Sequence, residues 1–175
     1  MNPTSLQYPI GKFQPPATID PHQIQDWIRE IQDFPTKFQA MADSLTHGHL
    51  NSPYRPGGWT ALQVIHHVPD SHMNAYLRFR WAMNEDHPMI KAYDEASLAK
   101  KKDYELIPYE ASMAFLQGIH GRWHELLSHM KATDWKRTYR HPEDGQTYQL
   151  DRVLGMYVWH GNHHYGHLKI VKEQR

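Results

Sequence analysis

The chain has 175 residues with 19 basic and 19 acidic side chains, so its formal net charge is zero and it has no general electrostatic attraction for nucleic acid or anionic membranes. It contains no cysteine, which excludes disulfides and thiolate metal sites. Because cysteine is absent, any transition-metal site must use nitrogen and oxygen ligands. The 15 histidines are the first candidates for such ligands.

We expect a single cytoplasmic domain that spans residues 1–175. This length is enough to enclose a hydrophobic core. No apolar run approaches the roughly 20 residues that a membrane-spanning helix requires. The first residues, MNPTSLQYPIGKF, lack the basic and apolar regions of a secretory signal.

The N-terminal segment, residues 1–18, is predicted to be an extended arm that lies over the domain, because it holds four prolines. From Asp20 the pattern becomes helical, with apolar residues at three-to-four spacing and a bend or break near Pro35. A loop rich in turn formers, HGHLNSPYRPGGW, follows this helix. The apolar positions of the first helix are Ile24, Trp27, Ile28, Ile31, Phe34 and Phe38.

The second helix is predicted to begin after Thr60, whose hydroxyl can cap the helix while Gln63 reaches back in a capping box. It extends to about Met83, with Pro69 as the expected site of a kink. Residues 84–107 are polar and lack clear periodicity. They are expected to form a loop with short helical turns.

The third helix is predicted over residues 108–131, since Pro108 suits a first helical turn. The stretch HPEDGQTYQL indicates a tight hairpin at Asp144-Gly145. The last helix is expected over residues 148–172. Four substantial helices predict an all-α four-helix bundle, with an extended N-terminal arm and a short hairpin or turn before the last helix.

The last helix carries four histidines in the segment WHGNHHYGHL. At about 100° per residue, His164 falls within the apolar stripe and His160 falls on its edge. His167 lies roughly a right angle away, and His163 lies further round, toward solvent. Histidines at i and i+4 can point two imidazoles at one metal ion. Two ordinary hydrogen-bonded core histidines are the alternative, but we favour metal ligation because a metal satisfies both buried rings.

A third ligand is expected from the second helix, where His66, His67 and His72 are candidates. His72 falls on the apolar side, whereas His67 belongs to a polar stripe. Such a stripe is more often a solvated face, although it could equally form the wall of a metal-containing cavity. Pro69 shifts the helical phase, so the wheel alone does not decide between these readings. The polar stripe consists of His67, Asp70, Ser71, Asn74 and Arg78.

On the third helix, His120 lies among apolar positions and faces inward, either as a packed core histidine or as a residue beside the site. The Gly57-Gly58 pair before Trp59 lacks the spacing and the lysine of a phosphate-binding loop. We interpret these glycines as a tight turn into the capped helix.

Several segments together resemble the YfiT-type family of candidate metal-dependent hydrolases, within the DinB-like superfamily of four-helix metalloproteins. In chain order these are YPIGKF, RPGGWTALQVIHHVPDSHMN, YDE, HGRWHELL, HPEDG and YVWHGNHHYGH. The resemblance covers nearly the whole chain, from Tyr8 to His167. Its GGWT…HH-x-x-DSH and WHG-x-HH blocks are far more specific than an isolated H-x-x-x-H.

The resemblance implies a DinB-like bundle that holds one divalent metal ion per chain through three histidines. The matching positions are His67, His160 and His164, and the assignment of His67 rests on the resemblance alone. Zinc is the expected metal, with nickel as an alternative. The resemblance also implies a homodimer and a cytoplasmic location.

Three functions fit such a site. The first is hydrolysis of an unidentified small molecule by metal-bound water, with Asp70, Asn74 or His120 as possible supporting residues. The second is a bacillithiol- or mycothiol-type S-transferase, in which Arg78, Arg80 or Lys91 could anchor the external thiol. The third is a non-enzymatic, metal-stabilised binding protein, with His72 or His163 as a fourth ligand. The residue pattern does not identify a substrate or a general base.

Overall fold

The computed structural model describes residues 6–174, and its first long helix, α2 (Pro21–Asp43), begins at a local capping signal. Asp20 accepts a hydrogen bond from the Gln23 backbone N–H at 2.9 Å, and Pro21 occupies the first turn, where a missing N–H has no intrahelical partner to lose. The helix continues through Pro35. The predicted break at Pro35 is therefore wrong.

The second long helix, α4 (Ala61–Asn84), follows a short helix α3 (His47–Leu50) and has the predicted capping box. Thr60 accepts from the Gln63 backbone N–H at 3.2 Å, while the Gln63 side chain accepts from the Thr60 backbone N–H at 2.9 Å. Pro69 lies inside the helix. The polar connection that follows contains two short helices, as predicted. These are α5 (Glu95–Leu98) and α6 (Asp103–Leu106).

The third long helix, α7 (Tyr109–Ser128), starts directly after Pro108 and ends a few residues before the predicted limit. A short 3-10 helix (Asp134–Lys136) leads into a hairpin of β1 (Thr138–Arg140) and β2 (Thr147–Gln149), and α8 (Leu150–Lys172) follows. Tyr148 pairs with Tyr139 in the antiparallel ladder. This pairing delays the start of α8 by two residues relative to the prediction. Gly145 has φ +66°, a conformation that glycine adopts without strain.

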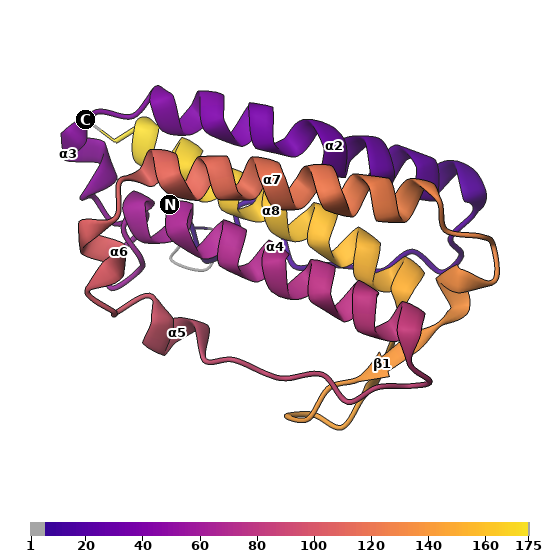
Figure 1. Ribbon diagram of the computed structural model, residues 1–175. Coiled ribbons are helices and arrows are strands. Elements are labelled where there is room, and N and C mark those ends of the chain that lie inside the picture. Colours follow the sequence, from indigo (N-terminus) through magenta and orange to yellow (C-terminus); the bar gives the residue numbers. More distant parts are fainter. Residues whose placement is uncertain (1–5, 175) are drawn as a thin grey trace.

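The four long helices lie side by side, with the hairpin at one end of the bundle and α3 and α6 at the other (Figure 1). Both α2 and α4 pack against both α7 and α8. Helices α2 and α4 therefore occupy opposite corners of the bundle, and so do α7 and α8. This arrangement places the middle of α8 between α2 and α4.

The core consists of two apolar clusters, one in each half of the bundle. Each long helix crosses from one cluster to the other near its middle. At that level α4, α7 and α8 place histidines between the two apolar clusters, and all of these are buried except the half-buried His160. We call these residues the histidine layer; its members are His67, His72, His120, His160, His164 and His167.

Residues 6–20 lie along α8, as expected for an N-terminal arm. Pro9 packs where a Cβ on Gly166 would approach to 2.8 Å, and the Trp159 indole donates to the Gly11 carbonyl at 3.1 Å. The arm therefore covers the face of α8 that turns away from the bundle core. The predicted arm also includes residues 1–5, which lie outside the described residues.

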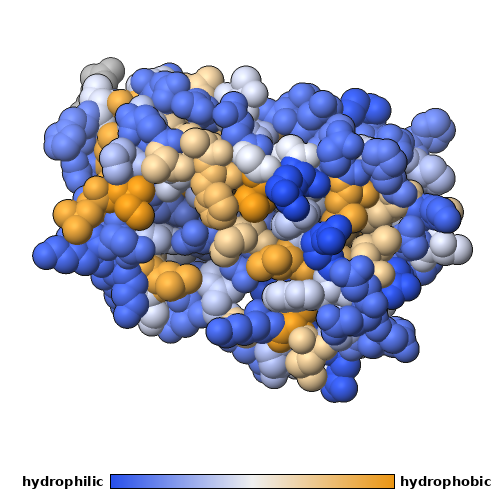
Figure 2. Space-filling view, in the orientation of Figure 1, coloured by the Kyte–Doolittle hydropathy of each residue, from blue (hydrophilic) through white to orange (hydrophobic). Residues whose placement is uncertain are grey.

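The surface is mostly hydrophilic, with apolar patches on the face that carries α6 and α7 (Figure 2). Leu106, Ile107 and Phe115 are among the exposed large apolar side chains. Within residues 6–174, no helix combines the length and apolar character needed to cross a membrane.

Candidate metal centre

Three histidines meet where the middle of α8 faces the first half of α4. His160 and His164 project from α8 one turn apart, and His67 projects from α4 toward them. One ring nitrogen from each of the three lies within 4.8 Å of the other two. His67 Nε2 and His160 Nε2 are 3.3 Å apart. The structure thus brings together the three residues that the sequence and the resemblance selected.

Burial keeps these three imidazoles neutral. Burial, with a smaller contribution from the nearby His163, lowers the pKa of His67 from the ordinary 6.5 to about 4. Burial likewise lowers the pKa of His160 and of His164 well below the ordinary value, with neighbouring histidines adding to the effect. A neutral imidazole keeps one nitrogen lone pair, which is the form that binds a metal ion.

The polar stripe on α4 is mostly buried, so its interpretation as a solvated face is wrong. His67 and Ser71 are each 4% exposed, and Arg78 is 7% exposed. The reason is that α8 packs against this stripe. Arg78 donates to the Tyr157 hydroxyl at 3.0 Å, and its guanidinium lies 5.9 Å from the centre of the Tyr139 ring.

The residues proposed to support the site have the following partners. Asp70 accepts from the Tyr104 hydroxyl at 2.5 Å, and the Asn74 side chain donates to the Asp70 carbonyl. Neither therefore bonds directly to one of the three histidines. His120 is 1% exposed, and its Nε2 lies 2.7 Å from His72 Nδ1. His120 thus connects to the centre through His72.

The other histidine candidates on α4 are directed elsewhere. His66 Nδ1 lies 2.7 Å from the Ser112 hydroxyl on α7. His72 Nε2 lies 3.2 Å from His160 Nδ1, on the side of the His160 ring away from His67. Both nitrogens of His72 are engaged by other histidines, so it is poorly suited to serve as a fourth metal ligand.

His163 does not face solvent, contrary to the helical-wheel prediction. It is 8% exposed because the N-terminal arm and Trp159 cover it, with the Tyr8 ring at 5.8 Å and the Trp159 ring at 4.7 Å between centres. His167, also outside the apolar stripe, is 2% exposed and stacks on Tyr54 at 3.8 Å. The wheel identifies the core side of α8 but contains no information about what covers the other side.

A cavity of about 360 Å³ opens onto the three histidines. The loop before α4 forms one wall: Gly57 has φ +69°, and the tight turn places the Trp59 ring 4.7 Å from that of His67. This confirms the interpretation of the glycine pair as a turn. The other residues that line the cavity come from the same loop, the arm, α5 and α8. They include Gln7, Tyr8, Tyr54, Arg55, Glu95, Trp159, His163 and His167.

The charged residues in this lining, Arg55 and Glu95, were not singled out in the sequence. Glu95 is exposed, but neighbouring protein atoms partly desolvate its carboxylate, and together with the nearby Glu143 and Asp94 carboxylates they raise its pKa. Glu95 comes from a short helix in a segment without periodicity, so only its spatial position reveals it. The proposed thiol anchors Arg78, Arg80 and Lys91 are absent from the described lining.

The chain matches the DinB superfamily over residues 30–168. A Bacillus pumilus protein named as a candidate metal-dependent hydrolase is 45% identical over 98% of this chain and 98% of its own. Bacillus subtilis YfiT, named in the same way, is 39% identical over 96% of this chain and 94% of its own. The solved YfiT structure superposes with a TM-score of 0.93 over 95% of each chain. It is described as a probable metal-dependent hydrolase with an unusual four-helix bundle topology.

Proposed function

Because this chain belongs to the DinB superfamily, among relatives named as candidate metal-dependent hydrolases, we propose that it hydrolyses a small molecule with the help of one divalent metal ion. We assign His67, His160 and His164 as the metal ligands. The observation that carries the proposal is the convergence of three neutral imidazoles on one point at the base of the cavity.

The donor set fits a metal ion. Tetrahedral zinc with Zn–N bonds of about 2.0–2.1 Å requires ligand nitrogens about 3.3 Å apart. His67 Nε2 and His160 Nε2 are separated by that distance. Three neutral ligands also leave the full charge of the cation available for chemistry. We propose zinc as the resident ion, with nickel as the alternative.

A divalent cation at this position would polarise a substrate oxygen and lower the pKa of a coordinated water. The chain supplies the surroundings for that chemistry. Trp59, Tyr8 and Trp159 line the cavity with aromatic rings. We assign Glu95 as the proton acceptor, because it is a carboxylate in the described lining and its pKa is raised above the ordinary value.

Metal content tests the ligand assignment. We expect about one divalent ion per chain, measured by mass spectrometry on protein purified without a metal-chelating tag. The variants His67→Ala, His160→Ala and His164→Ala should lose it. His66→Ala is a matched control, since His66 is buried on the same helix but bonds to Ser112. Metal that is substoichiometric and insensitive to the three changes would refute the assignment.

A substrate screen tests the reaction class. Metal-loaded protein and the variant Glu95→Gln are compared on ester, amide and activated amide substrates, with and without an added low-molecular-weight thiol. Hydrolysis without thiol, reduced in Glu95→Gln at unchanged metal content, supports the proposal. Turnover that requires the thiol would identify an S-transferase. A stoichiometric metal ion with no exchangeable water would identify a binding protein.

The homodimer and the cytoplasmic location implied by the resemblance belong to the same proposal. Sedimentation equilibrium of the full chain measures its oligomeric state directly. A single species of twice the chain mass is the expected result.

A further inference from the structure

Both proposed ligands on α8 contact another buried histidine through their second ring nitrogen. His160 Nδ1 lies 3.2 Å from His72 Nε2, and His164 Nδ1 lies 3.3 Å from His167 Nδ1. A neutral imidazole carries one hydrogen, so one of its nitrogens donates and the other accepts. The direction of each hydrogen bond is therefore set by the last group in the series.

In the first series, the last group is a backbone carbonyl of α2. His120 Nδ1 lies 2.5 Å from the Ile31 carbonyl oxygen, which can only accept, so His120 Nδ1 donates. His120 Nε2 must then accept from His72 Nδ1, at 2.7 Å. His72 Nε2 in turn accepts from His160 Nδ1. His160 Nε2 is consequently left without a hydrogen, and it is this atom that faces His67.

In the second series, the last group is a carbonyl of the N-terminal arm. His167 Nε2 lies 3.2 Å from the Gln7 carbonyl oxygen and donates to it. His167 Nδ1 must then accept from His164 Nδ1, which leaves His164 Nε2 as the atom with the free lone pair. The Tyr54 ring, stacked on His167 at 3.8 Å, holds the ring in this orientation.

We propose that His72, His120 and His167 are positioning residues whose hydrogen bonds, anchored on the Ile31 and Gln7 carbonyls, fix the tautomers and ring orientations of His160 and His164 so that each presents Nε2 to the metal ion. We call the two series the α2 relay and the arm relay. The inference rests on the proposed function, which assigns His160 and His164 as ligands. Partners of this kind typically raise metal affinity by about 10- to 100-fold.

The relays consist of neutral rings, as the tautomer argument requires. His72 and His120 are each 1% exposed and His167 is 2% exposed. A buried imidazolium without a carboxylate partner is costly, so each ring carries a single hydrogen.

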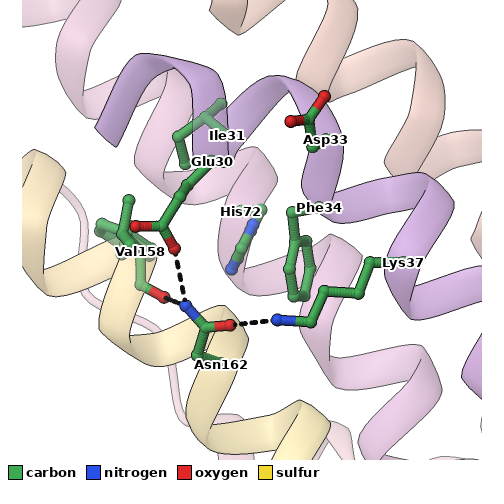
Figure 3. Close-up of a pocket in the computed structure, with 9 residues that line it drawn as sticks. Glu30, Ile31, Asp33, Phe34, Lys37, His72, Val158 and Asn162 are labelled. Atoms are coloured by element: carbon green, nitrogen blue, oxygen red, sulfur yellow. Dashed lines mark hydrogen bonds between the residues drawn. The ribbon is translucent and has the colours of Figure 1, made fainter. Parts of the chain in front are cut away.

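Among residues 6–174, the two ring nitrogens of His72 have hydrogen-bond partners only within the α2 relay. His72 lies beside Phe34 at a cavity of about 90 Å³ between α2 and α8 (Figure 3). The Phe34 ring is 5.5 Å from that of His72. The polar groups at this cavity already bond to one another: Asn162 donates to Glu30 at 3.0 Å and accepts from Lys37 at 2.8 Å.

The arm relay also argues against metal binding at a second cluster of histidines. His163, His164 and His167 have ring nitrogens within 4.8 Å of one another. In the arm relay, however, His167 donates through Nε2 and accepts through Nδ1, so neither nitrogen is available to a metal ion. We therefore expect one ion per chain and not two.

Metal affinity of matched variants tests the proposal. His72→Phe and His167→Phe keep an aromatic ring in place but remove the acceptor. His72→Gln and His167→Asn return an amide oxygen near the lost nitrogen. We expect the zinc dissociation constant, measured by competition with a chelator, to rise about 10- to 100-fold in the Phe variants and less in the amide variants. His66→Phe, a buried histidine outside both relays, should retain the wild-type value.

The tautomers themselves can be read from the metal-free protein. Long-range ¹H–¹⁵N spectra of ¹⁵N-histidine-labelled wild-type protein should show hydrogen on Nδ1 of His72, His120, His160 and His164, and on Nε2 of His167. Because this measurement needs no variant, a variant that fails to fold leaves the test intact. It also needs no metal, so it remains decisive if the proposed function is wrong.

Two outcomes would overturn both relays, and a third would overturn the arm relay alone. One is hydrogen on Nε2 of His160 and His164 in the metal-free wild type. The other is wild-type affinity in folded Phe variants while His160→Ala still loses the ion, which would leave the metal site standing without the relays. A second equivalent of tightly bound zinc that is lost in His167→Asn would assign His167 as a ligand instead.

Discussion

The two ends of the bundle and its middle are built from the same four helices, yet they are held together by different interactions. At the ends, side chains such as Phe79 and Leu168 are fully buried in apolar clusters. In the middle, buried and half-buried positions hold imidazoles that contact one another at hydrogen-bonding distance. Apolar contacts are non-directional, whereas each ring in the histidine layer depends on a specific neighbour. The ends therefore stabilise the fold, and the middle holds the geometry of a site.

Truncation of an apolar end should give the largest effect on stability. Phe79→Ala removes a side chain with 0% exposure and should lower the free energy of unfolding by about 3–5 kcal/mol, through lost transfer energy and a cavity. Urea denaturation measures the change. The exposed Phe115→Ala is the control and should change stability by less than about 0.5 kcal/mol. If folded Phe79→Ala lost its metal ion at native conditions, the separation between ends and middle would be wrong.

The histidine layer should make stability depend on pH. His120 has its pKa lowered by burial to about 4, below the ordinary 6.5, so the unfolded chain binds the proton first as pH falls. The contribution of His120 to the free energy of unfolding is complete above pH 6.5. It declines between pH 6.5 and 4, by at most about 3 kcal/mol. Urea titrations of metal-free wild type and His120→Phe from pH 4.5 to 7 measure this. Identical pH profiles for the two proteins would contradict the prediction.

Metal binding should stabilise the middle of the bundle independently of the ends. Zinc at 100 times its dissociation constant should raise the free energy of unfolding by about 2.7 kcal/mol, because the unfolded chain lacks the assembled site. Thermal unfolding with and without zinc gives this increment. It should be absent in His164→Ala and unchanged in Phe79→Ala. A smaller increment in Phe79→Ala would show that the two regions are coupled.

The helix start beside the site should have the smallest effect. Thr60→Ala removes the capping hydroxyl of α4 and should cost about 1 kcal/mol, whereas Thr60→Ser keeps the hydroxyl. Chemical denaturation measures both variants. The zinc dissociation constant should remain that of the wild type, since His67 lies about two turns further along the helix. A change in metal affinity at Thr60→Ala would mean that the cap positions His67.

Much of the fold could be read from local signals. The apolar spacing of α2, the capping box at Thr60 and the proline before α7 each act within a few residues, and all three mark elements that the structure contains. The hairpin turn at Asp144-Gly145 was also predicted from local signals, but the register that pairs Tyr148 with Tyr139 was not, because it depends on a strand nine residues earlier. It shortens α8 at its start.

The residues of the site likewise fall into those that the sequence predicts and those that only the fold reveals. The 100° helical period selects His160 and His164, and the resemblance supplies His67. The burial of His163 depends on Tyr8 and Trp159, and the role of Glu95 depends on how a loop without periodicity folds over the cavity. A helical wheel describes one helix and carries no information about its neighbours.

The sequence by itself therefore determined an all-α chain, its capped helices and the histidines that face the core, because these follow from backbone geometry and from interactions between residues close in the chain. Only the tertiary structure decided which nitrogen of each histidine meets which partner. The Ile31 and Gln7 carbonyls lie 89 and 160 residues, respectively, from the rings they contact, and the folded bundle alone brings each pair together.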